Sequence, residues 1–299
     1  MKKYLVSILL FSCSLFGMEK DSKKLTVYAA PGCRGDRFRE FTSYLKKTLD
    51  SDKTDIIFVE SFPLFLKDLG QFWSGRRLSS DISKEGIIYG VCNGGATALN
   101  FFADHQDDAR IKGVFLEGAF ASANLAIKDV SESFLVGLPK LPLSAYWMPY
   151  IVKLWHPFYR PIGRQPIKSV SRISTECPIV IMHAMRDCIL PDVHAKALYY
   201  ALKKNGNKNV YFVHDDSSRH LYLRPYKDRV MSTILQKHGL LTASAKSEEV
   251  DLTSFQPPFE QFEDAFKQVR RVEQVHTFLY PAVLYGSFCV LRKLFRKFM

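Results

Sequence analysis

Short apolar segments recur along most of the chain and alternate with segments of helical periodicity. Runs such as Gly86–Val91 and Ile179–Met182 are apolar at successive positions, which is typical of strands buried on both faces of a sheet. Helical spacing appears in residues 94–102, 193–204 and 221–237. This alternation predicts an α/β domain with a doubly wound, mostly parallel sheet covered by helices on both faces. The predicted strands are Leu25–Ala30, Ile56–Val59, Gly86–Val91, Val114–Leu116, Ile179–Met182 and Val210–Val213.

One long segment interrupts the alternation within the predicted domain, which covers residues 24–240. Residues 119–174 are rich in Pro, Tyr and Trp. A segment of this length inside a compact domain is usually a functional cover or a subdomain of its own. We therefore expect a helical lid insertion, and a helical decoration with no role toward substrate is the alternative.

Beyond the predicted domain the sequence indicates a linker and a helical extension. Residues 241–257 predict the linker, and residues 258–299 predict a helix that is amphipathic at first and then apolar. The apolar run 278–291 is too short to span a bilayer. With the basic cluster that follows it, the run suits attachment at an anionic membrane surface. Packing of this helix on the domain is the alternative.

The N-terminus has the features of an export signal. Lys2 and Lys3 precede an apolar run that ends at Phe11, and small residues follow around Cys13. This order predicts a signal peptide over residues 1–18. The segment also resembles a lipoprotein signal, in which Cys13 would carry the lipid. Either reading predicts an exported protein in the periplasm or cell envelope, with membrane attachment as a further option.

The charge balance is basic but does not by itself identify a partner. The 299 residues include 42 Lys and Arg against 30 Asp and Glu, which gives a formal net charge of +12. Part of this excess lies at the two ends of the chain, and no DNA- or RNA-binding motif is visible. We therefore expect no nucleic-acid partner.

The clearest local motif is Gly90-Val-Cys92-Asn-Gly94, which joins a predicted strand to a predicted helix. A nucleophile at such a junction sits in a sharp turn, and its neighbours two residues away must be small. The start of the helix favours a thiolate, because the helix dipole and backbone amides point toward it. A buried structural cysteine in a glycine-rich turn is the alternative reading of this motif alone.

Two further segments of the sequence contain candidate catalytic residues. Pro178-Ile-Val-Ile-Met-His183-Ala-Met-Arg-Asp187 is a strand followed by an acidic residue, and His220 follows the last predicted strand. Together with the cysteine motif, these segments resemble the α/β-hydrolase superfamily from about residue 25 to residue 239. The order nucleophile, acid, base matches that superfamily. The resemblance implies a catalytic triad of Cys92, Asp187 and His220.

The same resemblance implies an oxyanion hole. Pro31-Gly32-Cys33 follows the first predicted strand, where the superfamily places a backbone donor. By that match, the backbone N–H groups of Cys33 and Asn93 would bind the oxyanion. Gly90 and Gly94 would form the tight turn around the nucleophile. No metal and no other cofactor is expected.

The cysteine motif resembles that of dienelactone hydrolases, which implies acyl transfer from a small-molecule ester or thioester to water through an acyl-enzyme. Transfer to another acceptor, by an acyltransferase, is a related reading. The alternative is an inactive protein that keeps the fold as a binding module. Individual residues also have simpler explanations: Asp187 as a helix cap, His220 as a solvated loop residue, and Cys92 paired with Cys33 in a disulfide. His214 is a second candidate base, and His183 is expected to support the turn before Asp187.

Overall fold

The computed structural model describes residues 24–32, 54–59, 69, 71, 78, 80–134, 144–156, 158–174, 176–215, 226–241 and 250–298. The predicted signal peptide, Cys33 and His220 lie outside these residues. So does the segment 38–45, for which the sequence also indicates a helix.

Six parallel strands form one sheet in the described part of the chain. They are β1 (Leu25–Ala30), β2 (Thr54–Phe58), β3 (Gly86–Val91), β4 (Ile111–Glu117), β5 (Ile179–Ala184) and β6 (Val210–Asp215). Their order is β2-β1-β3-β4-β5-β6, and every neighbouring pair is parallel. All residues of β1, β3 and β5 are buried, as expected of strands covered on both faces. The predicted fold class is confirmed.

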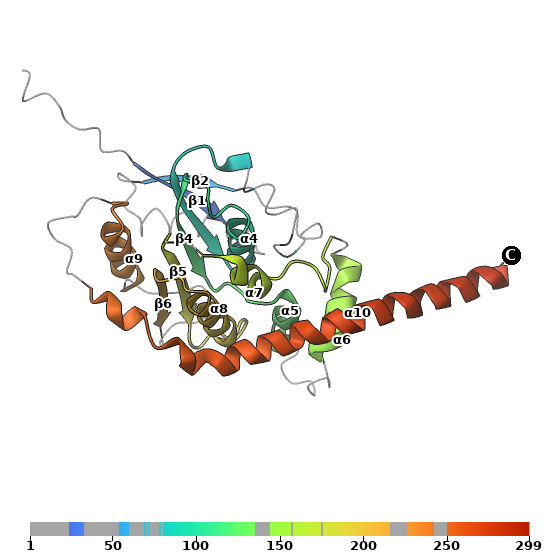
Figure 1. Cartoon of the computed structure of the whole chain (residues 1–299). Helices are drawn as coiled ribbons and strands as arrows, with labels where there is room; N and C mark the ends of the chain where they lie inside the picture. The colour runs from blue at the N-terminus through green and yellow to red at the C-terminus, as the bar shows by residue number, and fades with distance from the viewer. Residues whose placement is uncertain are drawn as a thin grey trace, which may run out of the picture.

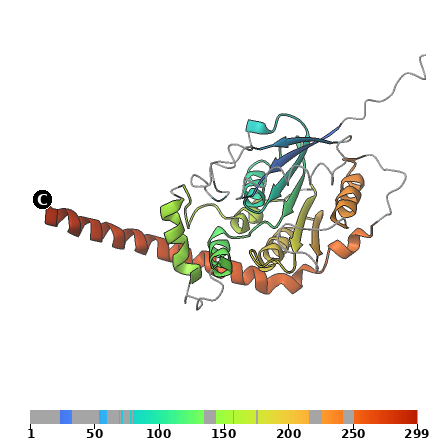
Figure 2. The same ribbon diagram turned by 180° about the vertical axis from the view of Figure 1, so that it is seen from behind.

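Helices cover both faces of this sheet (Figures 1 and 2). On one face the core contains side chains from α4 (Asn93–Phe102), α7 (Pro166–Ser169) and α8 (Val193–Lys204). On the other face α9 (Tyr226–Lys237) packs against the opposite side of the same strands. The remaining helices are α5 (Ala123–Phe134), α6 (Ser144–Trp155) and α10 (Glu263–Phe298), and the short 3-10 turns are η3 (Val170–Arg172), η4 (Leu252–Phe255) and η5 (Phe259–Phe262).

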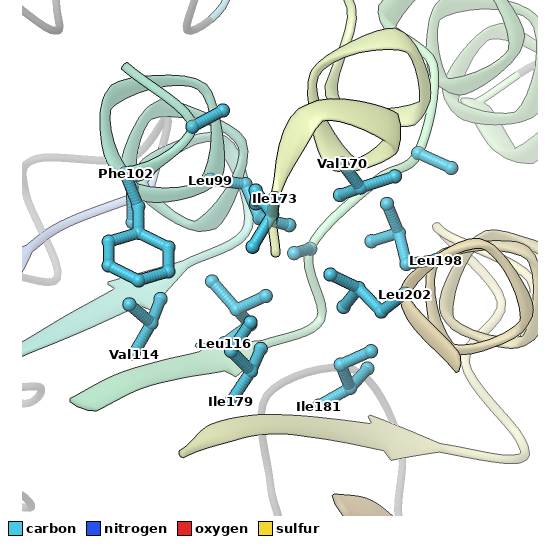
Figure 3. Close-up of a cluster of buried hydrophobic side chains, with 14 of the residues drawn as sticks. Leu99, Phe102, Val114, Leu116, Val170, Ile173, Ile179, Ile181, Leu198 and Leu202 are labelled. Atoms are coloured by element: carbon cyan, nitrogen blue, oxygen red, sulfur yellow. The ribbon is translucent and has the colours of Figure 1, made fainter. Parts of the chain in front are cut away.

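The larger core lies between the sheet and the layer of α4, α7 and α8. Figure 3 shows Phe102 of α4 facing Val114 of β4, and Leu198 and Leu202 of α8 beside the strands. Phe102 and Val114 are fully buried. Hydrophobic side chains from helices and strands therefore pack together at this face of the sheet.

Strand β4 is longer than the sequence indicates. Lys112 and Gly113 interrupt the apolar run, which limits the prediction to residues 114–116. In the structure β4 begins at Ile111, because backbone hydrogen bonds to β3 continue across a register irregularity near Gly86. Backbone pairing with a parallel neighbour thus outweighs the polar side chain of Lys112.

The predicted insertion at residues 119–174 contains α5, α6, α7 and η3. Helix α6 continues through Pro149. A satellite core joins this segment to the domain, with Phe120, Ile127 and Tyr159 on one side and Leu190 on the other. Whether the segment acts as a lid remains a proposal.

Residues 250–257, in the second half of the predicted linker, pack against the domain. Leu252 and Phe255 are buried with the α9 side of the core. The Tyr199 hydroxyl donates a hydrogen bond to the Pro257 carbonyl. The chain then continues into α10, a helix of 36 residues that includes Pro281.

The first half of α10 is anchored by the buried carboxylate of Glu273. Its Oε1 accepts hydrogen bonds from Ser122 Oγ and from Asn124 Nδ2 at 2.9 Å, and its Oε2 lies 3.1 Å from Lys168 Nζ. The Tyr159 hydroxyl donates to the Asn124 side-chain oxygen. Burial raises the pKa of Tyr159 well above its ordinary value, and the charge of Glu273 adds to this, so the phenol stays protonated as a donor.

The second half of α10 leaves the domain and extends away from it (Figures 1 and 2). The side chain of Phe278 is 79% exposed and that of Tyr285 is 72% exposed. Helix α10 therefore combines a half that packs on the domain with a half that projects. In the described part of the chain, no helix combines the length and the apolar character needed to cross a membrane.

The contrast between buried and exposed phenylalanines gives the first prediction. Phe102→Ala is expected to lower the free energy of unfolding by about 3–5 kcal/mol, because it leaves a cavity in a closely packed core. Phe278→Ala is the matched control and is expected to change it by less than about 0.5 kcal/mol. Urea unfolding followed by circular dichroism measures both, and equal effects would contradict the packing described here.

The anchoring of α10 gives the second prediction. Glu273→Ala is expected to destabilise the protein by about 3 kcal/mol, because Ser122 and Asn124 lose a buried acceptor and Lys168 loses its counter-ion. Hydrogen exchange is expected to speed up in residues 263–277 first. Glu263→Ala, on the same helix, removes a half-exposed partner of Lys267 and is expected to have an effect below about 0.5 kcal/mol. Unchanged exchange in Glu273→Ala would refute the anchoring role.

Candidate functional site

Cys92 lies at the sharp turn between β3 and α4. Its backbone dihedrals are φ 51° and ψ −115°, a combination that L-residues rarely adopt. Such a conformation costs on the order of 1–3 kcal/mol and persists only where the surrounding structure enforces it. Among the described residues other than glycine, Leu69 alone shares a positive φ. Strain of this kind is characteristic of functional sites.

The glycines at positions 90 and 94 permit this turn. A Cβ at Gly94 would lie 2.0 Å from the Ala30 carbonyl oxygen, and a Cβ at Gly90 would lie 2.6 Å from the Gly94 oxygen. Neither position has room for a side chain. Because glycine has no side chain, α4 can approach both β1 and β3 more closely than it could with any other residue at these two positions.

Backbone hydrogen bonds hold Cys92 from both sides. Its N–H donates to the Glu117 carbonyl at the end of β4, at 2.8 Å. Its own carbonyl accepts from the N–H groups of Gly95 and Ala96, which starts α4. The thiol side chain is half-buried at the boundary between the α9-side core and the insertion core. The Cys92 thiol thus sits at a helix N-terminus, where the dipole favours an anion.

Asn93 is the first residue of α4, and its polar side chain is buried. It is 5% exposed, and its Oδ1 is buried without a hydrogen-bond partner within the part of the chain that the structure describes. A buried amide oxygen without a partner costs roughly 1–3 kcal/mol. This buried oxygen lies directly after Cys92 in the chain, at the start of α4.

Asp187 lies in the loop after β5 and is held firmly. Its Oδ1 accepts hydrogen bonds from the N–H groups of Ile189 at 2.8 Å and Leu190 at 2.9 Å. His183 Nε2 donates to the Leu190 carbonyl at 2.9 Å and lies 4.0 Å from Asp187 Oδ2. His183 thus supports the loop that carries Asp187, as the sequence predicts.

The carboxyl ends of the central strands bring these residues to one edge of the sheet. Gly118 N–H bonds to the Met182 carbonyl, and Met185 N–H bonds to the Asp215 carbonyl, so the ends of β4, β5 and β6 are aligned. His214 lies near the end of β6 with an exposed side chain. His220 follows five residues after β6, and Cys33 directly follows Gly32, but both lie outside the described residues, so the structure places neither.

Gly32, two residues after the end of β1, lies beside Cys92. A Cβ on Gly32 would be 3.2 Å from the Cys92 Cβ. The turn after β1 therefore lies directly against Cys92.

Glu117 and Tyr89 form a buried polar pair that sequence reasoning misses. The Tyr89 hydroxyl donates to Glu117 Oε2, and both residues are buried. Since the Glu117 carbonyl accepts the Cys92 N–H, this pair fixes the end of β4 that supports the elbow. The sequence signal is a single acid at the carboxyl end of an apolar strand, a position where burial without a partner would be costly.

No metal site is evident in the described ranges. They contain no group of three or more His, Cys, Asp or Glu side chains placed to hold an ion. The described residues at this edge of the sheet offer a thiol at a strained turn, a carboxylate held by two backbone amides and a buried side-chain amide.

Comparison with known proteins shows similarity in structure. No protein-family model matches the chain, and no curated protein matches its sequence. An acylaminoacyl peptidase of Pyrococcus horikoshii matches with a TM-score of 0.52 and 12% identity over 79% of this chain, which spans 40% of the peptidase. The esterase Pf2001 of Pyrococcus furiosus matches with a TM-score of 0.51 and 14% identity, over 72% of this chain and 82% of the esterase.

A third solved structure is Est1E from Butyrivibrio proteoclasticus, with a TM-score of 0.52 and 14% identity over 75% of this chain and 92% of Est1E. At such low identities the likeness is one of fold. The order of the strands, the strand-to-helix elbow and these structural neighbours agree, and the chain has the α/β-hydrolase fold.

Proposed function

We propose that this protein is a hydrolase that cleaves an ester or thioester by way of a covalent acyl-enzyme on Cys92. The observation that carries the proposal is the strained backbone of Cys92 at the elbow, with φ 51° enforced by the close approach of Gly90 and Gly94. Such strain is retained where it presents a reactive group. The fold shared with two esterases supports the same reaction class.

In this proposal His220 is the base and Asp187 orients it. Asp187 Oδ1 is held by two backbone amides, which directs the carboxylate as a fixed unit. Its Oδ2 is the oxygen that would accept from an imidazole N–H of His220. This contact would keep the imidazole in the tautomer that draws the proton from Cys92. The alignment of the β5 and β6 ends is compatible with that contact.

The chemistry proceeds in two steps. Cys92 Sγ attacks the carbonyl carbon as its proton passes to His220, and the resulting oxyanion collapses as His220 protonates the leaving alcohol or thiol. Water then attacks the acyl-enzyme, gives its proton to His220, and releases the carboxylic acid with the thiol restored. The N–H groups of Asn93 and Cys33 would bind the oxyanion in both steps.

The Asn93 side chain adds a second role to this site. Its buried amide makes no hydrogen bond through Oδ1 within the described residues. A substrate that carries a donor near its carbonyl would supply the missing partner. This favours small acyl substrates with a hydroxyl or amide group close to the reacting carbon, over purely aliphatic ones.

Two other functions remain as outcomes of the test. An acyltransferase would form the same acyl-enzyme and pass it to an acceptor other than water. An inactive binding protein would keep the elbow but lack an activated thiol. Reactivity of Cys92 separates the inactive reading from both enzymatic ones.

The third prediction concerns thiol reactivity. At pH 6.5, iodoacetamide is expected to label Cys92 on the order of 10²-fold faster in the wild-type protein than in His220→Ala, because the base is removed. Peptide mass spectrometry measures each cysteine separately. Burial raises the pKa of the Cys177 thiol to about 12, so Cys177 is expected to stay unlabelled. Exposed Cys188 provides the reference rate of an ordinary thiol.

Turnover of p-nitrophenyl esters and acyl thioesters completes that test. Activity is expected to disappear in Cys92→Ala and to fall in Asp187→Asn. Cys92 labelling no faster than Cys188, together with no turnover, would support the inactive binding protein instead. Burst release of the leaving group that stops after one equivalent would indicate an acyltransferase that lacks its acceptor.

The fourth prediction compares two asparagines of α4. Asn93→Leu is expected to leave the free energy of unfolding unchanged or raise it by about 1 kcal/mol, because an uncompensated buried amide is removed. Activity on a substrate with a nearby donor is expected to fall about fivefold to tenfold. Asn100→Leu is the matched control. Its Oδ1 accepts from Ser169 Oγ at 2.6 Å, so that variant is expected to lose about 1–3 kcal/mol. Equal destabilisation of the two variants would contradict the special role of Asn93.

A further inference from the structure

Exposed apolar side chains are concentrated in one part of the molecule. The large hydrophobic residues that are exposed within the described ranges all belong to α6, to the segment just after it, or to α10. They are Ile151, Phe158, Ile162, Phe278, Val283 and Tyr285. Single exposed apolar residues are normal, but their restriction to neighbouring elements marks an interaction surface. We call this set the α6–α10 surface.

Helix α6 and helix α10 form one unit at this surface. Tyr150 of α6 stacks on Tyr280 of α10, with ring centroids 6.2 Å apart, and its hydroxyl lies 3.3 Å from His276 Nδ1. Both views show the two helices crossing at the side of the molecule away from α9 (Figures 1 and 2). Anything that binds the projecting half of α10 is therefore brought next to the insertion.

The projecting half of α10 is apolar around its circumference. From Phe278 to Leu291 the sequence contains no charged residue, and it reads Phe-Leu-Tyr-Pro-Ala-Val-Leu-Tyr-Gly-Ser-Phe-Cys-Val-Leu. A helix of this kind is normally buried in protein or in lipid. The domain leaves much of its described surface uncovered: Tyr280 contacts α6, but Phe278 and Tyr285 are largely exposed. We therefore expect a lipid bilayer or another protein to cover the apolar residues of this part of α10.

Charge identifies the partner. From Gln274 to Met299 there is no Asp or Glu, and Arg292, Lys293, Arg296 and Lys297 lie in the last turns of the helix. An apolar helix segment that ends in a basic cluster matches a bilayer surface with anionic headgroups. We propose that the protein attaches to an anionic phospholipid membrane through the second half of α10, with the exposed residues of α6 beside it.

The length of the apolar run decides how the helix binds. Its 14 residues rise about 21 Å as a helix, which is less than the roughly 30 Å of a hydrocarbon core. The helix therefore enters the headgroup region and one leaflet, and the basic end stays with the phosphates. A second copy of the chain is a less suitable partner, because a two-helix contact needs one apolar stripe with polar residues opposite.

The fifth prediction is a vesicle-binding experiment on the full chain. Sedimentation with phosphatidylcholine vesicles that contain 30% phosphatidylglycerol is expected to retain the protein, and the pure phosphatidylcholine vesicles are expected to retain much less. Replacing Arg292, Lys293, Arg296 and Lys297 by Gln is expected to weaken binding at least about tenfold. Replacing Phe278, Val283 and Tyr285 by Ser is expected to weaken it on both kinds of vesicle. Raising the salt concentration should lower binding to anionic vesicles only.

A matched variant controls for net charge. Lys204, Lys208, Lys267 and Arg271 are exposed basic residues of the packed part of the molecule, and their replacement by Gln removes the same charge. This variant is expected to bind anionic vesicles within about twofold of wild type. All variants keep the same N-terminus, so any binding by residues 1–18 is common to them.

Three results would overturn the proposal. The first is equal loss of binding in the tail and control variants, which would show a general charge effect. The second is vesicle binding that none of the tail substitutions changes. The third is absence of vesicle binding together with a dimer, by light scattering, that the three Ser substitutions dissociate. None of these readouts requires enzymatic activity, so the outcome is independent of the proposed hydrolysis.

Discussion

The close approach of α4 to the ends of β1 and β3 is the constraint on which the rest of the site depends. Gly94 lies so near the Ala30 carbonyl that no side chain fits, and the chain must turn at Cys92 through a left-handed conformation. That turn directs the thiol-bearing residue out of the strand and starts a helix immediately after it. The Glu117 carbonyl, fixed at the end of β4 by the Tyr89 pair, accepts the Cys92 N–H and stabilises the turn from the other side. Strain at one residue is thus balanced by packing and hydrogen bonds from three strands.

The buried polar groups near this elbow differ in whether their side chains have hydrogen-bond partners among the described residues. Asn100, Asp187 and His183 all have partners, and each fixes a helix or loop in place. Asn93 is as well buried, yet its side-chain oxygen has no partner in the described part of the chain. Natural proteins tolerate few such groups, because each lowers stability. In the proposed function, the missing partner of Asn93 is a donor group of the substrate.

The sequence predicts the sheet well because its strands are continuous apolar runs with clear boundaries. Cys92 stands out because it directly follows such a run, and Asp187 because it lies in the loop after another. It does not predict Glu273. A glutamate in an amphipathic helix is usually solvated, and its burial here depends on Ser122 and Asn124, about 150 residues earlier in the chain. Glu117 is missed for the same reason, since its partner Tyr89 comes from another strand. Two prolines lie inside helices, Pro281 in α10 and Pro149 in α6, and each helix continues through its proline. Long-range partners and packing, which no local pattern records, decide these cases.

Helix α10 has a part that is anchored to the domain around the buried Glu273 and a part that projects from it. Glu273 is the last acidic residue of the chain, and it is fully engaged with the insertion and α7. Up to that point the helix alternates charged and apolar residues and packs on α8, α5 and α6. His276 and Tyr280 still contact Tyr150 of α6. From Phe278 to Leu291 the sequence has no charged residue and a basic cluster follows, and this part of the helix projects from the domain. A helix that only stabilised the fold would not require this second half.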